Sequence, residues 1–98
     1  MEINDKIKIG SMEYKVTKTD KPLILDNKEC KGTIDYENLV INISTNIAEQ
    51  RQEETFIHEV LHGIIRERNL ILEDEEMIVD EISKGLYQVI KDNMDIFR

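Results

Sequence analysis

The first half of the chain alternates apolar and polar residues with a period of two, the pattern of strands that bury one face. Residues 6–9 and 12–17 show this pattern, the apolar run 23–25 is a further short strand, and residues 32–36 and 39–43 are expected to pair as strands. Gly10-Ser11, Asp26-Asn27 and Glu37-Asn38 interrupt the pattern and are typical of tight turns. We therefore expect two hairpins, over residues 6–17 and 32–43, within a curled antiparallel sheet of three to five strands.

Beyond residue 44 the apolar period changes to about 3.6, which predicts helices. The first helix is expected over residues 47–68, with Asn69 as a left-handed residue just after its end. Three residues can cap its start, namely Ser44, Thr45 and Asn46. A second helix is expected over residues 75–92, capped by Asp74. Its apolar arc consists of Ile78, Val79, Ile82, Leu86, Val89 and Ile90.

A sheet followed by two helices predicts an α+β fold, with a sheet region over residues 1–44 and a helical region over residues 45–98. The 98 residues are enough for one small domain with a single core.

Both histidines of the chain lie in the sequence His58-Glu59-Val60-Leu61-His62, which is an HExxH motif. On a helix, two imidazoles four residues apart lie on one face and can bind one zinc ion together. Glu59 points to the neighbouring side, where it can act as general base on a metal-bound water. The segment from Thr55 to Ile65 carries no other charge, which favours a metal site over two ordinary half-buried histidines.

A helical wheel places the two histidines at the edge of an apolar arc and Glu59 further round, towards the open side. The arc consists of Ile57, Leu61, Ile64 and Ile65. A metal held there would lie where the core meets solvent, as a catalytic site requires.

The third ligand is expected to be a carboxylate, because a catalytic zinc usually has three protein ligands and one open position. There is no third histidine, and Cys30 lies in the strand region. The candidates are Glu73, Asp74, Glu75, Glu76, Asp80 and Glu81. We choose Glu76, with Asp80 on the same helical face as a hydrogen-bond acceptor for a ligand histidine. Asp80 and Glu75 are the alternative ligands; otherwise a Glu75→Gln change should be nearly silent.

The composition narrows the possible partners. A net charge of −8, with lysines and arginines scattered along the chain, argues against direct nucleic-acid binding. The single cysteine fits a reducing compartment, and no apolar run approaches the ~20 residues of a membrane helix. We therefore expect a cytoplasmic protein that does not associate with membranes; the oligomeric state is left open.

The chain resembles the gluzincin metallopeptidases in three features. These are the hairpin, the run Thr55-Phe56-Ile57 before the motif, and the pair Glu76 and Asp80 after it. Within that group, residues 39–93 are most similar to small phage- and mobile-element-associated proteins of the ImmA/IrrE type and to minimal one-domain gluzincins. The resemblance implies one zincin-like domain over residues 1–98, in which His58, His62 and Glu76 bind zinc and Glu59 is the general base.

A zinc-dependent metallopeptidase that hydrolyses peptide bonds is thus the favoured function. The strand over residues 39–43, as an exposed edge, could pair with an extended peptide or protein substrate. Two alternatives stay open: a non-catalytic interaction protein stapled by zinc, and, less favoured, an acidic mimic of DNA.

Overall fold

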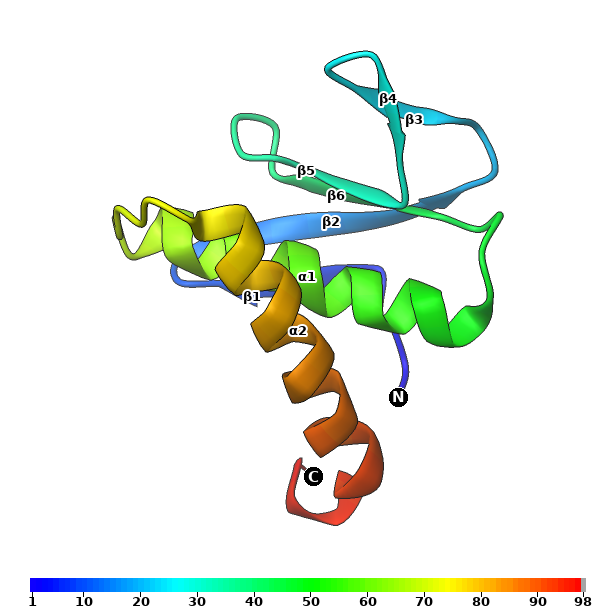
Figure 1. The fold of residues 1–98 in the computed structure, drawn as a ribbon, viewed down its shortest axis with the longest axis vertical. Helices are drawn as coiled ribbons and strands as arrows, with labels where there is room; N and C mark the ends of the chain where they lie inside the picture. Colours follow the sequence, from blue (N-terminus) through cyan, green and yellow to red (C-terminus); the bar gives the residue numbers. More distant parts are fainter. Residues whose placement is uncertain (98) are drawn as a thin grey trace.

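The computed structural model describes residues 1–97 and has an α+β fold, as the sequence predicts. A four-stranded sheet carries helix α1 across one face, and helix α2 crosses α1 steeply (Figure 1). The strands are β1 (Lys6–Ile9), β2 (Met12–Thr19), β3 (Leu23–Leu25), β4 (Lys28–Cys30), β5 (Gly32–Asp35) and β6 (Val40–Ser44). The helices are α1 (Glu49–Glu67), α2 (Glu75–Asp92) and a short 3-10 helix (Met94–Phe97).

The sheet has the strand order β1-β2-β6-β5 and is mixed. The two outer pairs, β1–β2 and β5–β6, are the antiparallel hairpins that the sequence predicts. The central pair, β2–β6, is parallel, so the expectation of a wholly antiparallel sheet is wrong there. Parallel neighbours need a long connection. Residues 20–39 provide it, and they include the separate β3–β4 hairpin and the edge strand β5.

The core lies between the sheet and the inner face of α1. Its buried apolar side chains are Ile9, Tyr14, Val16, Ile41, Ile43 and Phe56. Gly63 lets α1 approach the sheet closely, because a Cβ there would lie only 2.8 Å from the Cδ1 atom of Ile9. The middle of α1, which carries the HExxH motif, is therefore held firmly against β5 and β1.

The two ends of α1 differ in how well the sequence predicts them. The residue at its start is Ala48, which makes no side-chain cap, so the proposed caps are wrong. Asn46 instead donates a side-chain hydrogen bond to the Asp20 carbonyl at 2.8 Å. At the other end Asn69 is left-handed, with φ of 56°, as predicted. Its N–H bonds to Arg66 and that of Leu70 to Ile65, a Schellman motif that turns the chain towards α2.

Helix α2 has the predicted bounds, but the face that it buries overlaps the expected apolar arc only in part. Its buried residues are Val79, Ser83 and Tyr87, whereas Ile82 in the predicted arc is 54% exposed. The helix is rotated so that its acidic edge faces α1, and the Tyr87 hydroxyl donates to Glu53 of α1 at 2.7 Å. Within residues 1–97, neither helix is long and apolar enough to cross a membrane.

Candidate metal centre

The HExxH residues occupy the middle of α1, where the helix lies beneath β5 and is crossed by the first turns of α2 (Figure 1). His58 and His62 are one helical turn apart, and their ring centroids are 4.9 Å apart. Because α2 folds back steeply over α1 after the turn at Asn69, its first turn reaches the two imidazoles. The tertiary fold thus brings Glu76 next to residues that precede it by 14 and 18 positions.

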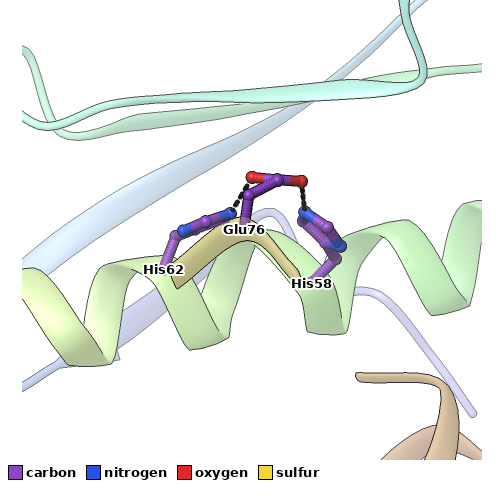
Figure 2. Close-up of side chains that lie close together, drawn as sticks. All are labelled: His58, His62 and Glu76. Atoms are coloured by element: carbon purple, nitrogen blue, oxygen red, sulfur yellow. Dashed lines mark hydrogen bonds and ion pairs between the residues drawn. The ribbon is translucent and has the colours of Figure 1, made fainter. Parts of the chain in front are cut away.

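The side chains of His58, His62 and Glu76 converge at one point, as predicted (Figure 2). One carboxylate oxygen of Glu76 lies 3.0 Å from His58 Nε2, and the other lies 2.8 Å from His62 Nε2. One ligand atom from each residue falls within 4.8 Å of the other two. Ligands of a tetrahedral zinc ion at ~2.0–2.2 Å stand roughly 3.4 Å apart, so small side-chain movements suffice. The group could hold a metal ion.

The Nδ1 atom of His62, on the side of the ring away from Glu76, has its own acidic partner in Glu75. Glu75 Oε2 lies 2.7 Å from His62 Nδ1, at hydrogen-bond distance. The sequence predicts such a role for Asp80, but Asp80 Oδ1 is 3.7 Å from His58 Nδ1, which is too far for a hydrogen bond. Asp80 instead pairs with Lys84 at 3.0 Å, a contact that lowers the pKa of the Asp80 carboxyl. The adjacent acids Glu75 and Glu76 thus hold opposite edges of one imidazole.

Replacing Glu75 by Gln should weaken zinc binding by about 10- to 100-fold, contrary to the nearly silent effect expected from the sequence. The carboxylate orients the His62 ring and strengthens its Nε2 as a donor, which a neutral amide does less well. Competition with a chromophoric chelator measures the affinity. Glu81→Gln is the matched control, because the Glu81 carboxylate pairs with Lys84 of the same helix at 3.5 Å and is not part of the group around the histidines. Equal affinities for the two variants would contradict the role of Glu75.

Glu59 is buried rather than turned to the open side as the helical wheel suggested. Its exposed fraction is 7%, because α1 packs against β5 on that side. Burial raises the pKa of the Glu59 carboxyl to about 7; His62 lowers it and Glu76 raises it. A carboxyl with such a pKa can take up and release a proton near neutral pH.

Gly32, the first residue of β5, allows the strand to lie directly on α1 at Glu59. A Cβ at Gly32 would lie 2.5 Å from Thr55 Cγ2, 3.1 Å from the Asn42 carbonyl oxygen and 3.4 Å from Glu59 Cγ. A larger residue fits only if the Thr55 side chain or β5 itself shifts. The close approach therefore sets how deeply the motif glutamate is buried.

Gly32→Ala should destabilise the fold by about 1–3 kcal/mol, the usual cost of overpacking a tight contact. Gly85→Ala is the control, because nothing lies within 4 Å of a Cβ at that helical position. There alanine should stabilise α2 by up to ~1 kcal/mol, since it is the better helix former. Urea denaturation monitored by circular dichroism measures both changes. A Gly32→Ala protein as stable as the wild type would refute the close contact.

The open edge of the sheet beside the metal centre is β5, not the strand over residues 39–43. That strand corresponds to β6, which is paired on both sides, with β2 and β5. The Ser44 N–H donates to the Lys31 carbonyl. In an antiparallel pair every second residue bonds to the partner strand, so the backbone groups of Lys31, Thr33 and Asp35 are directed towards β6. The N–H and C=O groups of Gly32 and Ile34 therefore face the open edge.

A cleft of about 1040 Å³ connects this edge to the metal centre. Its walls are β5, the β3–β4 hairpin and the two helices, and they include Glu59 and the three residues that could hold a metal ion. Tyr36, just after β5, also lines the cleft, and the Arg66 guanidinium lies 4.6 Å above the centre of its ring. The arrangement thus places two imidazoles, a carboxylate ligand, a buried carboxyl and an exposed strand edge around one space.

Three residues of this site were not predicted from the sequence: Glu75 as the partner of His62, Gly32 as the contact of β5, and Tyr36 as a cleft residue. The sequence names Glu75 only as an alternative metal ligand, because helix periodicity gives no information on which acid meets an imidazole of another helix. Gly32 carried a usable signal, because a glycine within a strand pattern often marks a close backbone approach. Tyr36 carried none.

Comparisons of this chain with protein-family models, curated proteins and solved structures found no match. The chemistry of the site is therefore argued from its residues and geometry.

Proposed function

We propose that this protein is a zinc-dependent peptidase of the gluzincin type. The observation that carries the proposal is the convergence of His58, His62 and Glu76 in an open cleft, with Glu59 of the same motif beside them. Two imidazoles and one carboxylate form the donor set of catalytic zinc sites that keep a fourth position open. A merely structural zinc site more often has four protein ligands.

A zinc ion in this group would supply a water of lowered pKa and polarise a substrate carbonyl. Glu59 would take a proton from that water and pass it to the leaving nitrogen. Its burial between α1 and β5 keeps bulk water away from the carboxyl. Glu75 would hold the His62 ring in the orientation in which Nε2 faces the metal.

The substrate would be an extended peptide segment lying along β5. The free backbone groups of Gly32 and Ile34 can pair with such a segment as an added strand. Because Gly32 lies against Glu59, a peptide paired there passes directly over the proposed base. Main-chain pairing selects extended backbone and leaves the choice of side chains to the walls of the cleft. We also propose that the protein acts in the cytoplasm, a reducing compartment that the single cysteine favours.

Purified without chelator, the protein should contain about one equivalent of zinc per chain, because three donors already converge. The zinc protein should cleave an unfolded protein substrate; chelation should stop cleavage and added zinc should restore it. Metal analysis by mass spectrometry and gel analysis of the digest measure these outcomes. Zinc without cleavage would favour the non-catalytic zinc-stapled protein, and no uptake of zinc would refute the proposal.

A further inference from the structure

The three tyrosines of the chain differ in how their hydroxyl groups are used. Tyr14 donates to Glu67 at 2.8 Å and Tyr87 donates to Glu53 at 2.7 Å, both across element boundaries. Among residues 1–97, the Tyr36 hydroxyl has no hydrogen-bond partner in the protein. Tyr36 is also the tyrosine that lines the metal cleft. Its donor is therefore available to a bound molecule.

The ring of Tyr36 is held in place from the motif helix. Arg66 packs its guanidinium over the ring at 4.6 Å, and Arg66 follows His62 by one helical turn. The ring thus lies along the His62 side of the metal centre, at the end of the β5 edge. Burial raises the pKa of the Tyr36 phenol most, and the nearby carboxylates of Glu75 and Glu59 raise it further. The hydroxyl therefore keeps its proton near neutral pH.

We propose that the Tyr36 hydroxyl donates a hydrogen bond to the carbonyl oxygen of the peptide bond being cleaved, which makes Tyr36 a catalytic residue. This inference rests on the proposed peptidase function. It assigns the donor for the developing negative charge, a role for which the sequence offered no residue.

Hydrolysis of the peptide bond would then proceed through an attack by water and a departure of the amine. The water oxygen forms a bond to the carbonyl carbon while Glu59 takes a water proton. The carbonyl π pair moves to the oxygen, where the Tyr36 O–H donates without transferring its proton. When the pair returns, the carbon–nitrogen bond breaks and Glu59 gives its proton to the leaving nitrogen. A donor aimed at the charge that develops stabilises the transition state more than the ground state.

The other hydroxyl groups of the cleft are engaged, buried or on the far face of the sheet. The Ser83 hydroxyl donates to the Asp80 carbonyl at 3.0 Å. Thr33 Oγ1 accepts a hydrogen bond from the Asn42 amide at 3.3 Å, and its side chain lies on the face of β5 opposite to the one where Gly32 meets α1. Thr55 is buried beneath Gly32, with its methyl group at the contact. Tyr36 is thus the hydroxyl of this cleft that is free to bind the substrate oxygen.

Tyr36→Phe removes only the hydroxyl and tests the inference. The probe is acetohydroxamate, a small zinc ligand with one oxygen at the carbonyl position, and calorimetry on the zinc-loaded protein measures its binding. We expect zinc affinity to stay unchanged and acetohydroxamate binding to weaken roughly 10-fold or more, the loss of one charged hydrogen bond. In peptide hydrolysis kcat should fall by about 100-fold, with little change in KM. The matched control is Tyr87→Phe, which removes the same atom outside the cleft.

The possible outcomes separate the role of Tyr36 from the proposed peptidase function. Weakened binding in Tyr36→Phe alone supports the inference. Equal effects in the two variants, or loss of zinc from Tyr36→Phe, overturn it and leave the proposed function standing. A zinc-loaded wild type that does not bind acetohydroxamate has no open position beside Tyr36, which overturns the inference and the catalytic function together. A wild type that takes up no zinc removes the proposed function first and the inference with it.

Discussion

Glu59→Gln should retain about one zinc ion per chain and lose peptide hydrolysis by roughly 10²–10⁴-fold in kcat. The amide cannot accept the proton of the attacking water, whereas His58, His62 and Glu76, which would hold the metal, are unchanged. Metal analysis and kcat on the same preparation separate the two properties. The buried position of Glu59 tolerates glutamine, because the side chains have nearly the same shape.

His62→Ala is the complementary variant. It should lose the metal and the activity together, since it removes one of three donors and leaves Glu75 and Glu76 without the imidazole between them. The division of roles is wrong if the two variants lose equal amounts of zinc. Hydrolysis that survives in Glu59→Gln would show that another group takes the proton.

Glu76→Gln should weaken zinc binding by more than the ~10–100-fold typical of residues that only orient a ligand. Glu76 offers the third donor, and one of its oxygens lies 2.8 Å from His62 Nε2, at the centre of the group. A neutral amide donates less charge to a cation. The effect should exceed that of Glu75→Gln, since Glu75 acts only through the imidazole.

Asp80→Asn is the control for Glu76→Gln, because the two acids are one turn apart on the same helix. Asp80 is paired with Lys84 and stands 3.7 Å from His58, so its change should affect zinc affinity less than that of Glu75. Competition titrations of the three variants under one buffer give the order. A larger loss for Asp80→Asn than for Glu76→Gln would make Asp80 the third ligand.

Local pattern predicted the elements well. The bounds of α2, the two hairpins and the left-handed Asn69 depend on neighbours within a few positions, and the structure confirms them. The short strand β4 was missed because Lys28 and Glu29 are polar and exposed and show no alternation. The start of α1 was misplaced because three capping residues precede it and none of them caps.

In the candidate site too, the features that depend on neighbouring residues were predicted better than those that depend on packing. The HExxH motif places two imidazoles on one helical face whatever surrounds the helix, so the sequence alone indicated a pair of histidines that could bind a metal ion. Choosing Glu76 from six acids needed an assumption about how two helices pack, and the structure places that side chain at the histidines. Glu75 was undervalued because its partner lies 13 positions away on another helix.

By itself, the sequence determined the α+β succession of elements and the spacing of the two histidines, because both depend on helical and strand periods over a few residues. Only the tertiary structure decided which strand forms the open edge, which face α2 buries, how deeply Glu59 lies and which acid meets each imidazole nitrogen. Those features depend on contacts between elements far apart in the chain. The physical reason is packing: Gly32 and Gly63 let α1 lie close against the sheet, and α2 packs on α1 with Val79, Ser83 and Tyr87 buried, which leaves Ile78 and Ile82 of its apolar arc exposed.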